Sequence, residues 1–284
     1  MPEQPKRVRV PDLGAMKRRE ERITVLTAYD WTMARLLDAA GIDVLLVGDS
    51  LGMVALGYPT TVPVTLDAMI HHAGAVARGT RRALVVADMP FLTYKVEVTE
   101  TLRNAGRLVQ EAGVAAVKLE GAGPALEATR AITGAGIPVM GHLGLTPQSV
   151  HQTGGFRLQA RTEEEAGRLL EDAQALESAG AFAIVLEKIP PQLAARVTSA
   201  LSAPTIGIGA GPWCDGQVLV SYDMLGLFQG AVPSFVRQYA NLGEQALDAA
   251  RRWAGDVRDG RFPAAEPGAD EPKPSSQAGS GGGA

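Results

Sequence analysis

The segment DAAGIDVLLVGD (residues 38–49) decides the fold, because it holds one complete transition from helix to strand. Its first residues end a helical pattern, and Gly41 is the residue type that commonly ends a helix in the left-handed conformation. The apolar run at residues 44–47 is typical of a strand buried on both faces of a parallel sheet. Gly48 and Asp49 follow, so the strand delivers a carboxylate at its carboxyl end.

The same order of helix end, glycine, short apolar run and polar residue recurs along the chain. Short strands that alternate with helices pair in parallel through right-handed crossovers. Eight of them favour a closed (β/α)8 TIM barrel over an open doubly wound sheet, with MLGLF fitting the pattern least well. The expected strands are ITVLT (23–27), VLLVG (44–48), ALVVA (83–87), AAVKL (115–119), IPVMG (137–141), AIVLE (183–187), PTIGIG (204–209) and MLGLF (224–228).

Composition limits both the class of protein and its partners. The chain has 284 residues, of which 46% are hydrophobic, and a formal net charge of −4, which argues against nucleic-acid binding. A single cysteine fits a reducing compartment. No secretory signal precedes the first strand, and no apolar run approaches the roughly 18 residues of a membrane span. We therefore expect a soluble, cytoplasmic protein that does not bind membranes.

The two ends of the chain differ from the middle. Residues 1–20 are polar and charged, and we expect a lead-in that packs loosely or caps one end of the barrel. Residues 21–263 would form a single barrel domain. Residues 264–284 are rich in Pro, Gly, Ser and acidic residues, a composition that predicts a disordered tail.

Ionisable residues follow five consecutive expected strands. Any one of them could be a solvated loop residue. The carboxyl ends of barrel strands share one rim, however, so all five would converge there, and uncompensated like charges would repel or protonate. Lys118 lies two residues before one of the acids, so it shares that face of the strand. The five residues are Asp49, Asp88, Glu120, His142 and Glu187.

A hard divalent cation is the natural compensation. Asp49, Asp88 and Glu120 offer carboxylate oxygens, which suit Mg²⁺ with positions left for water and substrate. Zinc is disfavoured, because the four histidines show no ligand spacing and Cys214 stands alone. We interpret Cys214 as structural.

Longer blocks of this sequence resemble the ketopantoate hydroxymethyltransferase family. The resemblance runs from residue 23 to residue 263, which is nearly all of the predicted barrel. It is carried by TAYD (27–30), VGDSLGM (47–53), TTVPVTLD (60–67), ADMPF (87–91), VKLEG (117–121), GHLGLTPQSV (141–150), GGFRLQAR (154–161), VLEKIP (185–190) and GIGAGPWCDGQVLVSYDMLGLF (207–228).

The resemblance implies a Mg²⁺-dependent barrel of the phosphoenolpyruvate/pyruvate superfamily type. Such an enzyme would transfer a one-carbon unit from 5,10-methylenetetrahydrofolate to α-ketoisovalerate, a small 2-oxo acid, and form ketopantoate for pantothenate and coenzyme A. It also implies a homo-oligomer, with a homodecamer as the family arrangement. The implied roles are metal binding for Asp49, Asp88 and Glu120, substrate binding for Asp49, Ser50, Asp88, Lys118 and His142, and general base for Glu187.

Two other functions are compatible with a barrel of this kind. A Mg²⁺-dependent lyase or mutase acting on a pyruvate-like enolate would need the same acids, but such enzymes generally add an acid or a cysteine on a mobile loop, and Cys214 lacks that context. A catalytically silent binding barrel should have lost a site acid or Lys118, and all are present.

Overall fold

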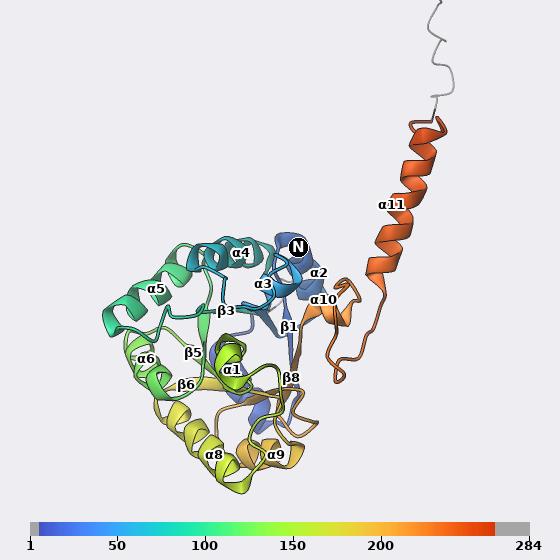
Figure 1. The fold of residues 1–284 in the computed structure, drawn as a ribbon. Coiled ribbons are helices and arrows are strands. Elements are labelled where there is room, and N and C mark those ends of the chain that lie inside the picture. The colour runs from blue at the N-terminus through green and yellow to red at the C-terminus, as the bar shows by residue number, and fades with distance from the viewer. Residues whose placement is uncertain (1–5, 265–284) are drawn as a thin grey trace, which may run out of the picture.

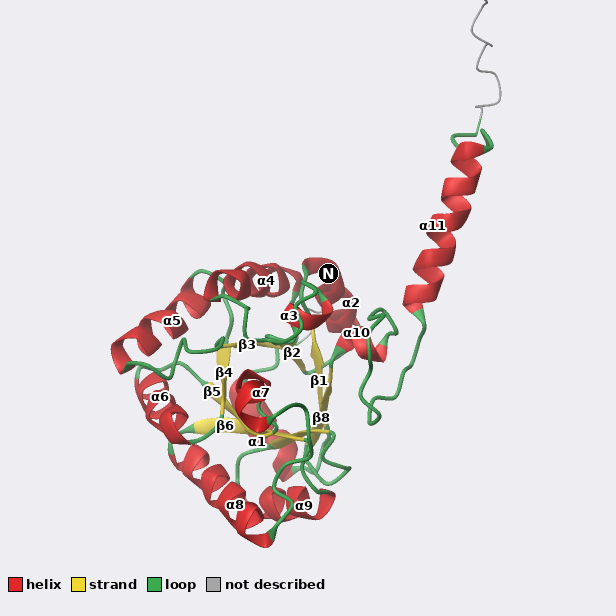
Figure 2. Cartoon of the chain, viewed as in Figure 1, coloured by secondary structure: helices red, strands yellow, loops and turns green. Residues whose placement is uncertain are grey.

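Eight parallel strands close into a barrel in a computed structural model that describes residues 6–264. Each strand is hydrogen-bonded to the next along the chain, and the eighth returns to the first. Figure 2 shows the strands at the centre with helices around them. The strands are β1 (Ile23–Thr27), β2 (Val44–Val47), β3 (Leu84–Asp88), β4 (Ala116–Glu120), β5 (Val139–Gly144), β6 (Ala181–Glu187), β7 (Thr205–Ile208) and β8 (Gly216–Leu219).

The helices form the outer layer of the barrel and close one of its ends. Those that follow β1 to β6 pack against the outside of the strands, and α8, for example, lies on β5 and β6. The helices are α1 (Val10–Arg18), α2 (Trp31–Ala39), α3 (Leu51–Val54), α4 (Leu66–Gly79), α5 (Val98–Gln110), α6 (Gly123–Gly134), the 3₁₀ turn η1 (Pro147–Ser149), α7 (Val150–Thr153), α8 (Glu163–Ser178), α9 (Pro191–Ala200), α10 (Ser221–Met224) and α11 (Leu242–Arg258).

Local sequence signals explain where the helices begin and end. The hydroxyl of Thr162 accepts from the backbone N of Glu165, whose carboxylate accepts from the backbone N of Thr162, which is a capping box. After α2 and α8, Gly41 and Gly180 adopt φ of +85° and +98°. A side chain at position 180 would also meet Thr133 at about 3.1 Å. The repeated glycine after a helix therefore does what the sequence predicts.

The inside of the barrel is filled by alternate residues of all eight strands. Val25, Val86, Met140 and Val218 are among these buried residues, and they form one cluster with Leu13 of α1. Leu13 is fully buried, so α1 closes the amino-terminal end of the barrel. The remaining core lies between the strands and the surrounding helices.

The predicted eighth strand is wrong, while the other seven are confirmed to within a few residues. Residues 224–228 form the end of α10 and the loop after it, and β8 lies earlier, at GQVL. The prediction failed because no helix separates β7 from β8, so the repeated unit is broken there. Glycine and glutamine also make β8 less apolar than residues 224–228, the segment predicted as the eighth strand. His142 lies within β5 rather than at its end, because β5 continues to Gly144.

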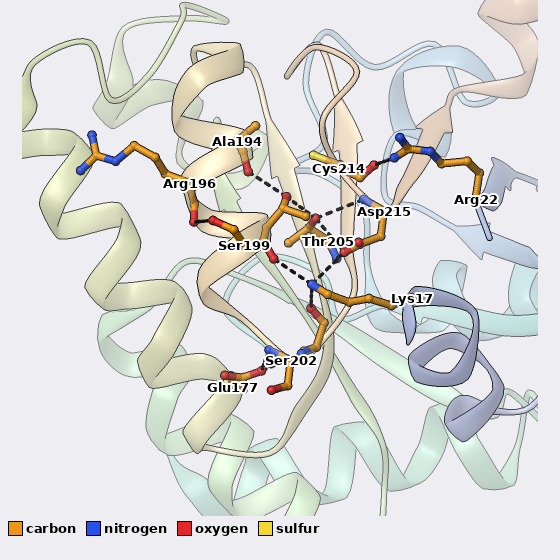
Figure 3. A network of polar contacts seen from close by, with 12 residues as sticks. Lys17, Arg22, Glu177, Ala194, Arg196, Ser199, Ser202, Thr205, Cys214 and Asp215 are labelled. Atoms are coloured by element: carbon orange, nitrogen blue, oxygen red, sulfur yellow. Dashed lines mark hydrogen bonds and ion pairs between the residues drawn. The ribbon is translucent and has the colours of Figure 1, made fainter. Parts of the chain in front are cut away.

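A buried lysine fastens α1 to the amino-terminal end of the barrel (Figure 3). The Lys17 ammonium donates to the carbonyls of Thr198 and Ala203 at 2.9 and 3.1 Å, and it lies 3.0 Å from Asp215 Oδ2. The same carboxylate oxygen accepts from the backbone N of Thr205 at 2.8 Å. The side chains of Lys17 and Asp215 are only 16% and 15% exposed, so water screens the pair weakly.

Residues 6–264 contain no helix with the length and apolar character that crossing a bilayer requires. Residues 265–284, which make up nearly all of the predicted tail, lie outside the described residues.

We predict that Lys17→Met lowers the free energy of unfolding by about 2 kcal/mol, because it leaves Asp215 without its cation and two carbonyls without a donor. Urea denaturation followed by circular dichroism would measure the change. Lys6→Met removes an exposed lysine and is the matched control. Equal stability of the two variants would mean that the Lys17 contacts do not stabilise the barrel.

Candidate active site

A cavity of about 380 Å³ opens at the carboxyl ends of the strands. Its wall contains every residue that the sequence singled out for metal binding, substrate binding or catalysis. These seven residues are Asp49, Ser50, Asp88, Lys118, Glu120, His142 and Glu187. The structure therefore brings them together from five strands, as the order of polar residues along the chain predicts.

The register between neighbouring strands sets which of these side chains meet. Asp88 of β3 pairs with Lys118 of β4, and Glu120 of β4 pairs with His142 of β5. Because side chains alternate along a strand, Lys118 and Glu120 both face the cavity while Leu119 packs in the core against the helices.

Lys118 is a buried cation at the centre of the acids. Its Nζ lies 3.1 Å from Asp88 Oδ1 and 3.1 Å from His142 Nδ1, and the residue is 4% exposed. Burial alone would lower the pKa of Lys118, but Asp88, Glu120 and Asp49 outweigh it and raise the pKa. The ammonium therefore stays charged at any physiological pH.

The three carboxylates are almost completely buried and exceed the cation in charge. Burial, Asp88 and Glu120 raise the pKa of Asp49. Burial also raises the pKa of Asp88, and Lys118 offsets part of that effect. For Glu120 burial is outweighed by His142 and Lys118, so its pKa is lowered. A further positive charge bound near Asp49 and Asp88 would relieve this repulsion.

His142 links two of the acids. Its Nδ1 lies 3.4 Å from Glu120 Oε1, and its Nε2 lies 3.2 Å from Glu187 Oε2. Burial and Lys118 would lower the pKa of His142, but Glu120 and Glu187 outweigh them and raise it. The imidazole therefore lies between the two carboxylates, with Nδ1 also in contact with the Lys118 ammonium and Nε2 facing Glu187.

Gly48 explains why a glycine precedes the acid in the opening segment. A Cβ at this position would lie 2.9 Å from Ser50 Oγ and 3.6 Å from Asp88 Oδ2. The backbone N of Asp49 donates to that Asp88 oxygen at 3.0 Å, and Ser50 Oγ lies 2.9 Å from the Tyr29 hydroxyl. The small residue therefore leaves room for the Ser50 hydroxyl beside the Asp88 carboxylate.

Gln148 is a site residue that the sequence analysis missed. It is 2% exposed, and its side-chain amide donates to Asp49 Oδ2 at 2.9 Å while its backbone N donates to Glu120 Oε2 at 3.0 Å. The Tyr94 hydroxyl donates to Gln148 Oε1 at 2.8 Å and accepts from the backbone N of Glu120 at 3.0 Å. Gln148 lies in the quoted block GHLGLTPQSV, but a glutamine in a loop carries no signal of burial.

The donor set fits a hard cation with few protein ligands. Within residues 6–264, no three His, Cys, Asp or Glu side chains already converge as a ligand set. Both Glu120 oxygens have partners in His142 and Gln148, whereas Asp88 Oδ1 has Lys118 as an ion pair but no well-directed hydrogen bond. Mg²⁺ is commonly bound through one or two carboxylates, with water and substrate completing its shell. Asp49 and Asp88 fit that description best.

The fold and the site together define a class of protein, a (β/α)8 barrel enzyme with a buried acidic centre. Among solved structures, the chain is similar in fold to a phosphonopyruvate hydrolase in complex with oxalate and Mg²⁺, with a TM-score of 0.60 and 15% identity over 91% of each chain. It is also similar to a 2,3-dimethylmalate lyase of the PEP mutase/isocitrate lyase superfamily, with a TM-score of 0.57, 20% identity, and coverage of 94% of this chain and 91% of that one. At these identities the likeness shows the fold alone.

Sequence comparison then gives the family. The model of the ketopantoate hydroxymethyltransferase family matches residues 7–265. A 3-methyl-2-oxobutanoate hydroxymethyltransferase from Moorella thermoacetica is 59% identical over 257 residues, which cover 90% of this chain and 96% of the relative. The enzyme of the same name from Thermosynechococcus vestitus is 57% identical over 257 residues, covering 90% and 98%. The chain belongs to the ketopantoate hydroxymethyltransferase family and is a hydroxymethyltransferase enzyme.

We predict that Gln148→Leu weakens the Mg²⁺ binding expected at this site about tenfold to a hundredfold, because Asp49 loses the side-chain amide that orients it, while the backbone N at position 148 still donates to Glu120. Calorimetric titration with Mg²⁺ in the presence of α-ketoisovalerate would measure the dissociation constant. Gln152→Leu changes an exposed glutamine of the same loop and serves as the control. An unchanged constant in Gln148→Leu would show that Gln148 does not position the metal ligands.

Proposed function

We propose that this enzyme transfers a hydroxymethyl group from 5,10-methylenetetrahydrofolate to α-ketoisovalerate and so forms ketopantoate, in a Mg²⁺-dependent reaction of pantothenate and coenzyme A biosynthesis. Membership of the family supports the reaction. The observation that carries the mechanism is a single cavity in which a buried ammonium, three buried acids and a histidine–glutamate pair face one another.

Asp49 and Asp88 would hold the metal ion, with Glu120 close behind them. A bound Mg²⁺ would supply Lewis-acid polarisation of the 2-oxo group, which makes the carbon 3 proton of the keto acid more acidic. Glu120 is already engaged by His142 and Gln148, so it would act by fixing water and its neighbours rather than as the first ligand. This proposal keeps Asp49 and Asp88 as ligands, and it differs from the three-ligand set that the resemblance implies by giving Glu120 a supporting role.

Lys118 and Ser50 suit the two ends of an α-keto acid. The Lys118 ammonium is permanently charged, so it can neutralise the substrate carboxylate where the neighbouring acids would otherwise repel it. The hydroxyl of Ser50 lies at the cavity wall and can donate to the same substrate, while the Tyr29 hydroxyl keeps it in place.

Glu187 would remove the carbon 3 proton. It lies at the end of β6, lines the cavity and is separated in sequence from the proposed metal ligands. His142 Nε2 lies 3.2 Å from Glu187 Oε2 without a well-directed hydrogen bond, and it is the polar group closest to hand for the carboxyl group once the proton is transferred. The apolar residues of the cavity wall exclude water from the enolate until it attacks the folate carbon.

No observation favours the lyase or mutase alternative. Cys214 is 1% exposed and packs in the core between the strands and α9, away from the residues that line the cavity. Burial raises the pKa of its thiol, which opposes the reactive thiolate form. No observation favours a catalytically silent barrel either, since every proposed site residue is present and lines the cavity.

We also propose that the enzyme acts in the cytoplasm as a homo-oligomer. Helix α11 has no buried residue and stands away from the barrel in Figure 1. Its Ala246, Ala250, Trp253 and Val257 recur at helical spacing, and the last two are 58% and 44% exposed. A second copy of the chain is the occupant we propose for this apolar face, because every copy in solution carries the same unpaired helix.

We predict that Trp253→Glu reduces the oligomer to smaller species, because it places a charge in the buried interface. Light scattering coupled to gel filtration would give the mass. Arg252→Glu changes an exposed neighbour on the polar side and should leave the mass unchanged. A wild-type monomer at micromolar concentration would contradict the proposal.

The central test separates enolisation from transfer. With α-ketoisovalerate in D₂O and no folate, we expect Mg²⁺-dependent loss of the carbon 3 proton signal in NMR. Glu187→Gln should slow this exchange by about a hundredfold or more, because the base is lost. Glu163→Gln, at an exposed position of α8, should exchange at the wild-type rate. Ketopantoate should form when methylenetetrahydrofolate is added.

A different result would overturn the proposal. If the wild-type enzyme, given Mg²⁺, keto acid and methylenetetrahydrofolate together, shows neither exchange nor ketopantoate, the transferase assignment fails. If exchange persists in Glu187→Gln at the wild-type rate, another group is the base.

A further inference from the structure

Asp223 is a buried carboxylate that the proposed mechanism does not use. It belongs to α10, directly after β8, and lines the same cavity as the acidic centre. The residue is 6% exposed, and its Oδ1 has no hydrogen-bond partner within residues 6–264. Burial raises the pKa of Asp223 to about 6, so at neutral pH most of the molecules carry an ionised, uncompensated carboxylate there.

Apolar residues close to Asp223 in the sequence line the same cavity, in contrast to the polar residues contributed by β2 to β4. Val218 and Val220 lie on the β8 side, and the loop after α10 contributes Phe228 and Phe235. A buried carboxylate in such surroundings costs stability unless donors reach it. A carboxylate in such a position is typical of a ligand subsite, because the ligand supplies the hydrogen-bond donors that the protein does not provide.

The keto acid is the wrong ligand for this position. Its carboxylate and 2-oxo oxygens are acceptors only at neutral pH, so Asp223 would repel them. The folate co-substrate has the opposite chemistry. The pyrimidine part of its pterin ring is flat, and the 2-amino group and N3 present two adjacent N–H donors, which match the two oxygens of one carboxylate.

We infer that Asp223 binds the 2-amino and N3 edge of the pterin ring, with Phe228 and Phe235 forming the apolar wall against which the ring lies. The inference rests on the proposed function, since it assigns a residue to the folate half of that reaction. It divides the cavity into a keto acid half at β2 to β6 and a pterin half at β8.

The two halves meet at Tyr29. Its hydroxyl contacts Ser50 Oγ at 2.9 Å, and its ring packs edge-on against Tyr222, the neighbour of Asp223. Burial and, to a smaller extent, the nearby Asp223 carboxylate raise the pKa of Tyr29. Tyr29 therefore contacts Ser50 in the keto acid half and lies near enough to Asp223 to feel its charge.

The test measures pterin recognition directly. In wild-type enzyme with Mg²⁺ and α-ketoisovalerate, calorimetry should show that 6-methyltetrahydropterin binds about tenfold to a hundredfold more tightly than the analogue lacking the 2-amino group. Asp223→Asn should lose this preference, and its KM for methylenetetrahydrofolate should rise by a similar factor. The KM for α-ketoisovalerate should change less than twofold.

Asp30→Asn is the matched control. Asp30 lies near Tyr222 but outside the cavity wall, and it caps α2 by accepting from the backbone N of Met33 at 2.8 Å, a role that asparagine also fills. This variant should keep the wild-type pterin preference. Asp223→Asn should melt at or above the wild-type temperature, because a buried charge is removed. A merely structural aspartate would instead give a lower melting temperature.

Three outcomes would overturn the inference. They are equal binding of the two pterins by the wild-type enzyme, an unchanged preference in Asp223→Asn, and a loss of folate-free carbon 3 exchange in that variant as large as its loss of transfer. Failure of the proposed function looks different, because the wild-type enzyme would then show neither exchange nor transfer while its Asp223-dependent pterin preference could still be measured. The wild-type comparison of the two pterins requires no variant to fold.

Discussion

The ion pair between Lys118 and Asp88 is the interaction on which the rest of the site depends. Three buried carboxylates that line one cavity repel one another, and the ammonium of Lys118 provides the first compensating charge. The pair forms because β3 and β4 place Asp88 and Lys118 in register. Barrel closure fixes that register, so the fold itself determines which charged side chains meet in the site.

The same constraint explains why the site needs support from outside the strands. Lys118 leaves Asp49 under-compensated, and the side-chain amide of Gln148 donates to Asp49 while the backbone N of Gln148 donates to Glu120. Tyr94 in turn fixes Gln148. Each of these groups is neutral, so they orient the carboxylates without neutralising them. A negative cavity that is rigid but not neutral is suited to bind a divalent cation.

The sequence predicts the part of the site that follows from strand periodicity. Asp88, Glu120 and Glu187 end apolar runs, and the shared rim of a barrel brings such residues together whatever the loops do. Gln148 and Asp223 could not be predicted in this way. Both lie after their strands, in segments whose burial depends on how the loops fold over the cavity, and neither residue type indicates burial.

The misplaced eighth strand has a related cause. The apolar run at residues 224–228 satisfies the rule for a buried strand, but it forms the end of α10 and the following loop, where its side chains are only partly buried. Periodicity alone cannot distinguish the two, because it reports that a segment is buried and not what covers it. Helix α11 is the opposite case. Its apolar residues recur at helical spacing, as they do on a covered helix face, but the single chain leaves that face exposed.

The placement of Asp223 also bears on how one cavity can serve two substrates of opposite polarity. The keto acid is an anion rich in acceptors, and it needs the half of the cavity that holds Lys118 and the proposed metal site. The pterin edge is a donor, and it needs an acceptor that the keto acid will avoid. The uncompensated Asp223 carboxylate, in the half of the cavity next to β8, attracts the pterin and repels the keto acid. Each substrate therefore binds in its own half of the cavity. The same charge that costs stability therefore prevents the keto acid from occupying the folate half.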